Sequence, residues 1–334
     1  MRGLARLMVI SGLLASGPVF AASFDCNAAK TLRERAICAD AELSQADEAL
    51  SAAYTTTRDA ASEAYRAELL TQQRLWLRTT GEVCTAGRKD PKDEDLRQCL
   101  KSDIVNRTDF LKRATAQLGP YRFVQNWRMA TAPDPDNADN AMWRLATAEV
   151  EWPVLEAPSS PKTDAFNAYV SRALHPEPLT ISDPSQDSDL SLRPLRATAG
   201  LIVLQRTDYF YGHGAAHGNY AVSTLTWLVD QQRVVAAGDV FEGKAWPGLL
   251  ADLVVAEFKR QNDGEAPWGE RADLLKMVAE PERWSFSAKA ITLSFNPYEL
   301  ASYAQGEIEL DIPWSKLEPV LSKASKTLPV LREQ

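Results

Sequence analysis

The feature that most constrains the fold of this 334-residue chain is its set of four cysteines, which all lie in the first third. In an exported chain an even number of cysteines indicates disulfides. If residues 28–37 are helical, Cys26 and Cys38 lie about 18 Å apart at about 1.5 Å per residue. Bridged Cα atoms lie within about 7 Å. We therefore expect two crossed disulfides, in which Cys26 and Cys38 each pair with Cys84 or Cys99; either arrangement is compatible with the spacing.

The N-terminus predicts export. Residues 1–21 have arginines near the start, a short apolar run and the small-residue ending Val19-Phe20-Ala21, which is the pattern of a cleaved signal peptide. The apolar run is too short to span a bilayer. A lipoprotein signal has small residues directly before its cysteine, whereas Ser23-Phe24-Asp25 precede Cys26. We expect a periplasmic or secreted protein with no lipid anchor and no membrane span.

Residues 22–118 have the apolar periodicity of helices. The repeating positions are Leu43, Leu50 and Tyr54, then Tyr65, Leu69 and Trp76, then Leu96, Leu100, Ile104 and Leu111. This pattern predicts a short helix and three longer ones, packed as an antiparallel bundle that the disulfides staple together.

The cysteines and helices of this region resemble the LprI-type lysozyme inhibitor domain. The chain departs from the family at Thr80-Gly81, where an Arg-Asp pair is usual before the third cysteine. The resemblance implies lysozyme binding, although most of the matching apolar residues are expected to form the core. The matching residues are Cys26, Thr31, Glu34, Ile37-Cys38, Leu43, Asp47, Leu50, Tyr54, Gln73-Arg74-Leu75-Trp76, Cys84 and Cys99.

Residues 119–142 are predicted to form a linker, because Gly119-Pro120 ends the last helix and residues 131–141 are rich in Pro, Asp and Asn. Residues 143–334 predict an α+β domain. Its sheet should be mainly antiparallel with helices packed against it, because long βαβ repeats are lacking from this sequence. Strands are expected near 143–155, 190–198, 200–210, 219–229, 284–295 and 307–314, and helices near 163–174, 247–260 and 270–278.

Residues 207–241 are the stretch around which the second domain is organised. From Asn219, apolar and polar residues alternate as in a strand that is buried on one side. The small-residue turn before it holds His213 and His217. Zinc binding is disfavoured, because the glycines around them argue against the helix that a His-x-x-x-His pair needs. We expect His217 to hydrogen-bond within the turn and His213 to be exposed beside Tyr211.

The second domain resembles the extracellular domain of the RsiV-type lysozyme-sensing anti-sigma factors and their uncharacterised secreted relatives. The resemblance implies lysozyme binding here too. Tyr298 and Tyr303 are expected to form an exposed aromatic platform, since tyrosine is enriched in binding hot spots. The residues that carry the resemblance are Gly214, Ala216 and His217 in the turn, Asp239-Val240-Phe241, and Tyr298, Glu299, Tyr303 and Gly306.

The charge distribution favours a cationic protein partner over nucleic acid. Residues 119–334 hold 29 acidic and 20 basic residues, whereas residues 22–118 hold 16 and 15. Ser159-Ser160-Pro161-Lys162 fits the S-x-x-K motif of acyl-enzyme hydrolases, but the companion motifs are absent, so a loop is expected there. The sequence also lacks a G-x-S-x-G motif and a phosphate-binding glycine loop. We therefore predict no catalytic residue, no cofactor and no metal.

Together these features predict an exported, non-enzymatic binding protein of two modules whose partner is a lysozyme-type muramidase. The expected partner-binding residues are Tyr211, His213, His217, Tyr298 and Tyr303. A peptidoglycan-binding module is the alternative hypothesis, and an unrecognised hydrolase is the third.

Overall fold

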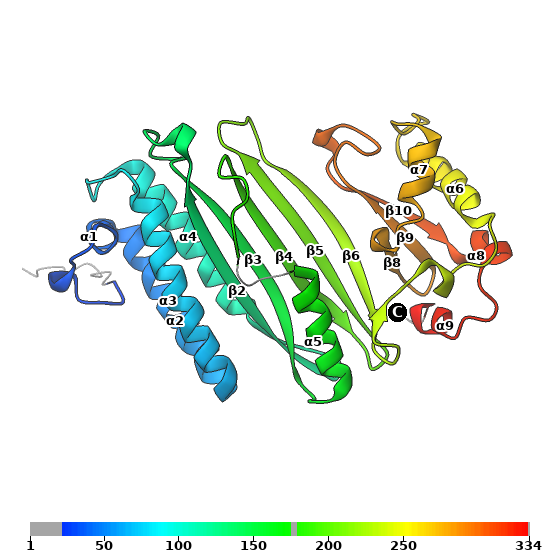
Figure 1. The fold of residues 1–334 in the computed structure, drawn as a ribbon, viewed down its shortest axis with the longest axis horizontal. Coiled ribbons are helices and arrows are strands. Elements are labelled where there is room, and N and C mark those ends of the chain that lie inside the picture. The colour runs from blue at the N-terminus through cyan, green and yellow to red at the C-terminus, as the bar shows by residue number, and fades with distance from the viewer. Residues whose placement is uncertain (1–21, 175–178, 333–334) are drawn as a thin grey trace, which may run out of the picture.

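The computed structural model describes residues 22–174 and 179–332, so the predicted signal peptide at residues 1–21 lies outside the described residues. A helical bundle forms one end of the molecule, a long twisted sheet the middle, and a smaller unit of helices and strands the other end (Figure 1). Within the two described ranges, each helix is too short or too polar to cross a bilayer.

The N-terminal bundle has the short helix and three longer helices that the periodicity predicts. Each helix begins after a side chain that accepts a hydrogen bond from its first turn, namely Thr31, Asp40, Ser62 and Asp93. The predicted apolar stripes meet in one core. The helices are α1 (Leu32–Ala39), α2 (Ala41–Ala60), α3 (Glu63–Thr85) and α4 (Glu94–Arg113), preceded by a 3-10 turn at Cys26–Ala28.

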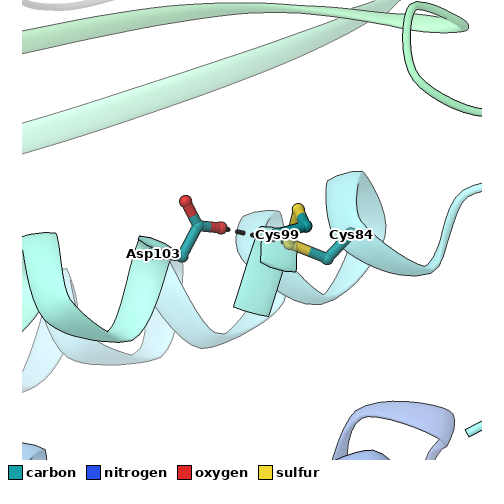
Figure 2. A group of neighbouring side chains, drawn as sticks. All are labelled: Cys84, Cys99 and Asp103. Atoms are coloured by element: carbon teal, nitrogen blue, oxygen red, sulfur yellow. Dashed lines mark hydrogen bonds between the residues drawn. A yellow bond between two sulfur atoms is a disulfide. The ribbon is translucent and has the colours of Figure 1, made fainter. Parts of the chain in front are cut away.

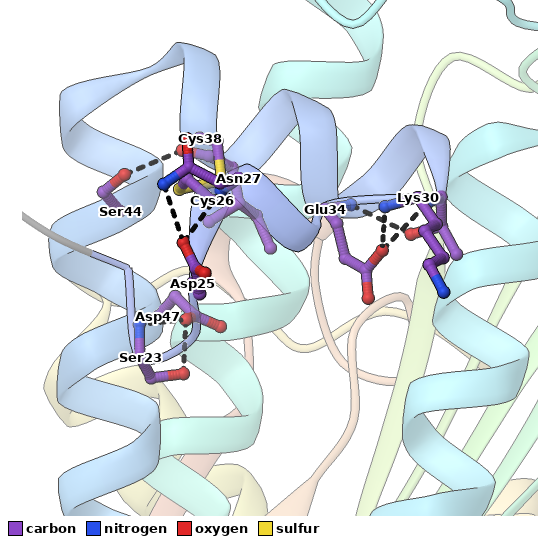
Figure 3. Close-up of a disulfide and its surroundings, with 11 residues drawn as sticks. Ser23, Asp25, Cys26, Asn27, Lys30, Glu34, Cys38, Ser44 and Asp47 are labelled. Atoms are coloured by element: carbon purple, nitrogen blue, oxygen red, sulfur yellow. Dashed lines mark hydrogen bonds between the residues drawn. A yellow bond between two sulfur atoms is a disulfide. The ribbon is translucent and has the colours of Figure 1, made fainter.

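The predicted crossed pairing of the cysteines is wrong. Cys26 pairs with Cys38 at a Cα–Cα distance of 5.7 Å, and Cys84 pairs with Cys99 at 5.6 Å. The error lies in the assumption that residues 28–37 are helical throughout. The first helix begins only at residue 32, so the preceding residues fold back and bring the first cysteine to the end of α1 (Figure 3).

The bundle is followed by a seven-stranded sheet in the order β1-β2-β3-β4-β5-β6-β7. Neighbouring strands are antiparallel except β3 and β4, which are parallel and are connected across α5 (Pro161–Leu174). The strands are β1 (Thr115–Leu118), β2 (Tyr121–Pro133), β3 (Leu145–Ala157), β4 (Gln186–Ala197), β5 (Leu201–Gly212), β6 (Asn219–Leu228) and β7 (Arg233–Val234).

Most of the predicted linker at 119–142 is part of this sheet. Residues 121–133 form β2, which pairs with β3 from Arg122 to Pro133. Gly119 has a φ of +54° and turns the chain between β1 and β2. The Gly119-Pro120 pair therefore lies in a hairpin turn and does not end the last helix, which ends at Arg113.

The two faces of the sheet are buried by different parts of the chain. Ile202 and Trp227 join a core with α5 on one face, while Leu201 joins the core of the C-terminal unit on the other. Trp127 of β2 packs into the core of the bundle. The strand register places Trp127 on the same face as Leu201. This face is thus covered by the bundle at one end and by the C-terminal unit at the other.

In the C-terminal unit, helices pack on a three-stranded antiparallel sheet of order β10-β9-β8. Its last strand confirms the predicted alternation, since Leu310 and Ile312 are buried while Glu309 and Asp311 are exposed. The α+β class predicted from the sequence is confirmed. The elements are α6 (Trp246–Gln261), α7 (Arg271–Met277), β8 (Trp284–Phe286), β9 (Ala290–Phe295), β10 (Ile308–Pro313), α8 (Trp314–Leu317) and α9 (Thr327–Arg332).

Candidate partner-binding site

The tip of the β5–β6 hairpin exposes aromatic side chains. Strand β5 ends in three consecutive aromatic residues, of which Tyr209 is 40% and Phe210 47% exposed. The third, Tyr211, donates its hydroxyl to the carbonyl of Ala215 at 3.0 Å, and the amide of Ala215 donates to the carbonyl of Gly212 at 2.9 Å. These two bonds close the turn and hold the end of the strand in place.

The loop between β9 and β10 is fastened to this hairpin, and both lie at the same edge of the molecule (Figure 1). The side-chain oxygen of Asn296 accepts a hydrogen bond from the amide of Val222 in β6 at 2.7 Å. Glu299 accepts from the amide of Asn296 at 2.7 Å and binds Arg283 through both carboxylate oxygens at 2.5 and 2.8 Å. Tyr298 therefore sits between two anchored residues.

Tyr298 combines an unfavourable backbone with an exposed ring. Its φ is +71°, in the left-handed region, where a residue other than glycine is strained by about 1 kcal/mol or more. Its side chain is 53% exposed. Strain of this kind persists only where the surroundings enforce it, which here are the contacts of Asn296 and Glu299.

Aromatic contacts join the hairpin and the loop into one surface. The rings of His217 and Tyr303 stack at a centroid distance of 4.4 Å, and Tyr303 also contacts the ring of Tyr298 at 5.5 Å. The hydroxyl of Tyr303 donates to the carbonyl of Gly218 at 3.0 Å. Tyr209 lies directly over Gly218, where a Cβ atom would collide with its ring. We call Tyr209, His217, Tyr298 and Tyr303 the hairpin-tip surface.

The prediction that His213 is exposed is wrong. Its side chain is 1% exposed, and its Nδ1 donates to Oδ2 of Asp134 at 2.6 Å. The ring stacks on Trp143, and Nε2 lies 3.6 Å from a carboxylate oxygen of Asp187. The hydrogen bond from His213 is the main reason that the pKa of Asp134 is lowered. His213 therefore fastens the hairpin to the loop after β2 and does not form part of the exposed surface.

The structure brings His217, Tyr298 and Tyr303 together and places Tyr211 nearby on the hairpin. As predicted, His217 hydrogen-bonds within the turn, since its Nδ1 donates to the carbonyl of Gly218 at 2.8 Å. Tyr209 and Phe210 were not among the partner-binding residues predicted from the sequence. A run of three aromatic residues was the available signal, because a strand that buries one face cannot bury all three.

Family comparisons identify the two ends of the chain. Residues 26–117 match the family described as lysozyme inhibitor LprI. Residues 239–315 match the family described as a protein of unknown function, DUF3298. No curated protein matches the chain.

Two solved structures of DUF3298 family proteins also match. One, from Bacteroides fragilis, is 17% identical, and the match covers 65% of this chain and 99% of that protein with a TM-score of 0.46. The other, from Pseudomonas aeruginosa, is 16% identical, and the match covers 62% of this chain and 96% of that protein with a TM-score of 0.43.

In the LprI-like region, the side chains of two of the matching acidic residues accept hydrogen bonds from other residues of the same region. Glu34 accepts hydrogen bonds from the amides of Lys30 and Thr31, which caps α1. Asp47 of α2 accepts from the amide and the hydroxyl of Ser23 at 2.9 and 2.6 Å (Figure 3). Both carboxylates therefore stabilise the bundle through hydrogen bonds to the backbone or to a hydroxyl.

At the departure from the LprI pattern, Thr80 is buried and Gly81 lies at the surface of α3. Gly81 lines a groove of about 570 Å³ between α1 and α3. Outside its own stretch of helix, no atom of the described residues lies within 4 Å of where its Cβ would be. Leu77, one turn earlier, is 46% exposed at the same groove. Position 81 therefore leaves open space at this groove, beside the exposed side chain of Leu77.

Among the described residues, Cys84, Cys99 and Asp103 have ligand atoms close enough to surround a metal ion. The two cysteines form a disulfide, with Sγ of Cys84 3.3 Å from a carboxylate oxygen of Asp103 (Figure 2). Metal binding by cysteine requires the thiolate, which a disulfide lacks. In the oxidised protein this cluster therefore joins the end of α3 to α4 and does not make a metal site.

Proposed function

We propose that this protein is an exported, non-enzymatic binding protein that inhibits a lysozyme-type muramidase. The observation that carries the proposal is the match of residues 26–117 to the lysozyme inhibitor LprI family. The two disulfides add support, because disulfides persist in oxidising compartments outside the cytoplasm.

The hairpin-tip surface is the proposed contact of the second module. It offers exposed aromatic rings on a backbone that hydrogen bonds already hold in place, so little conformational freedom is lost on binding. The excess of acidic residues in 119–334, 29 against 20 basic, would attract a basic enzyme. The resemblance of this module to the RsiV-type domain implies the same class of partner.

Peptidoglycan is the second candidate partner. Trp268 is 55% exposed, and its amide donates to the carbonyl of Leu300 at 2.8 Å, so an exposed tryptophan extends the region around Tyr298. A row of exposed aromatic rings is also a surface on which sugar rings can stack.

A pull-down experiment separates these functions. The mature protein is incubated with lysozyme immobilised on beads and, in parallel, with purified insoluble peptidoglycan. We expect retention on the lysozyme beads, loss of lysozyme activity in solution, and no release of sugars by the protein alone. Sedimentation with peptidoglycan without retention on lysozyme would support the alternative, and sugar release by the protein alone would reveal a hydrolase.

A further inference from the structure

A charged cavity of about 430 Å³ lies between α4 and the middle strands of the large sheet. Its size falls in the range of about 300–1,000 Å³ that is typical of small-molecule sites. Trp76, Phe110 and Trp127 contribute apolar walls, and Arg107, Glu149 and Glu151 contribute charge. The cavity is separate from the hairpin-tip surface, with which it shares no lining residue.

Arg107 is the most unusual residue of this cavity. It is only 3% exposed, and its guanidinium lies over the rings of Phe110 and Trp127 at 4.5 and 5.1 Å. Its Nε donates to the side-chain oxygen of Gln73 at 3.0 Å. Neither terminal nitrogen has a partner among the described residues. Two buried cationic donors on a residue that lines the cavity therefore lack a partner in the described part of the chain.

Glu151 presents the opposite charge on the strand side of the cavity. It is 6% exposed, and its Oε2 accepts from Arg113 at 2.8 Å and from Arg193 at 3.0 Å. Its Oε1 is buried and has no partner among the described residues. A buried anionic acceptor and the buried donors of Arg107 thus both lack partners, on two residues that line the same cavity.

Glu149 lies beside these groups but is less suited to hold a cation. It accepts a hydrogen bond from the indole of Trp127 at 3.0 Å. Burial raises its pKa to about 7, so near neutral pH a large share of this carboxyl is uncharged. Glu151, which two arginines contact, has a buried carboxylate oxygen without a partner among the described residues.

We propose that this cavity binds a small zwitterion, an α-amino acid or a short peptide. The ligand's carboxylate would accept from the terminal nitrogens of Arg107, and its ammonium group would donate to Oε1 of Glu151. A simple anion would leave the carboxylate oxygen unpaired, and a simple cation would leave the guanidinium unpaired. Buried charged groups without partners are costly, so a ligand with both charges matches the cavity best.

The first test uses dipeptides that differ in one charge at a time. Alanyl-alanine, as its L,L and D,D forms, is titrated calorimetrically into the dialysed mature protein at millimolar concentrations. The N-acetylated and C-amidated forms of each dipeptide follow. We expect at least one free dipeptide to bind, and each of its capped forms to bind about tenfold more weakly or worse, because each cap removes a charge-assisted hydrogen bond.

Variants then assign the two charges. Arg107→Gln should abolish binding, and Glu151→Gln should bind the free and the N-acetylated dipeptide equally. If Arg107→Gln fails to fold, the loss of discrimination in Glu151→Gln still tests the proposal. Arg260→Gln and Glu309→Gln, which change exposed residues far along the chain, serve as controls and should bind as the wild type does.

Two results would overturn the proposal. One is the absence of binding by both free forms of alanyl-alanine at millimolar concentrations. The other is equal binding of free and capped forms to the wild type. Neither result depends on lysozyme, so the proposed function is tested separately.

Discussion

The hairpin-tip surface and the charged cavity border the same sheet, yet they hold their side chains in opposite ways. At the tip, Tyr298 is exposed and is positioned by hydrogen bonds that the side chains of Asn296 and Glu299 accept from backbone amides. In the cavity, Arg107 and Glu151 are almost fully buried. Their positions depend on hydrogen bonds with other side chains, namely Gln73 for Arg107 and Arg113 for Glu151. Removing an exposed ring lowers the free energy of unfolding little. Removing one buried charged group lowers it much more, because the opposite charge beside it is left buried without a partner. Binding and stability should therefore separate at the tip and change together in the cavity.

The largest effect on stability is expected from an apolar residue that belongs to neither site. Trp227 is 2% exposed and contacts Phe166 and Tyr169 at ring distances of 5.9 and 5.0 Å. Trp227→Ala should lower the free energy of unfolding by about 3–5 kcal/mol, as measured by urea denaturation. A loss below about 1 kcal/mol would show that this side of the sheet is not the core of the domain.

Removing the disulfide beside the cavity should have the next largest effect. The Cys84–Cys99 bridge closes a loop with a sequence separation of 15, and cross-links of this length stabilise by about 3 kcal/mol. Replacing both cysteines with serine should lower stability by about that amount. Titration of the unfolded, unreduced wild type should find no free thiol. Cys26→Ser/Cys38→Ser, which opens the other bridge with a sequence separation of 12, is the comparison and should lower stability by a similar amount.

The cavity should also make stability depend on pH through Glu149. Burial raises its pKa from the ordinary 4.5 to about 7, so the folded protein binds more protons than the unfolded chain between these values. Its contribution to stability is complete below the lower value and is lost as the pH rises through the higher one. Glu149→Gln should therefore gain about 1–3 kcal/mol relative to the wild type between pH 4.5 and 8. If the free energy of unfolding changed with pH in the same way in both proteins, Glu149 would not be the group responsible for the pH dependence.

Helices and strands with a regular apolar pattern were predicted correctly from the sequence, whereas features that depend on the position of a turn were not. Heptad-like spacing around Leu96 and Leu100 located α4, and alternation located β6 and β10. The disulfide pairing depended on where α1 begins, which a helical pattern alone does not reveal. The strand at 121–133 was hidden because Gly119-Pro120 suits a hairpin turn as well as a helix end.

The sites were predictable to different degrees for a physical reason. The aromatic residues of the tip are visible in the sequence as tyrosines beside a small-residue turn. The burial of Arg107 could have been predicted from its spacing. It lies three residues after Ile104 and four before Leu111, so it is on the apolar face of α4. The burial of His213 could not be predicted, since its partner Asp134 lies 79 residues away.

The smallest predicted effect concerns long-range charge at the tip. If the acidic second module attracts lysozyme, raising the ionic strength should reduce the association rate several-fold and change the dissociation rate little. Surface plasmon resonance at low and high salt measures both rates. Equal association rates would show that the acidic excess does not contribute to binding.

The most direct test of the proposed function measures lysozyme binding and thermal stability on the same variants. The double variant Tyr209→Ala/Tyr298→Gly removes two exposed rings, and glycine suits the positive φ at position 298. Leu195→Ala, which changes another exposed residue on β4, is the control. We predict that the double variant melts within a few degrees of the wild type and binds lysozyme about tenfold more weakly or worse, while the control is unchanged. Wild-type affinity in the double variant, or equal weakening in the control, would contradict the assignment of the hairpin tip as the binding surface.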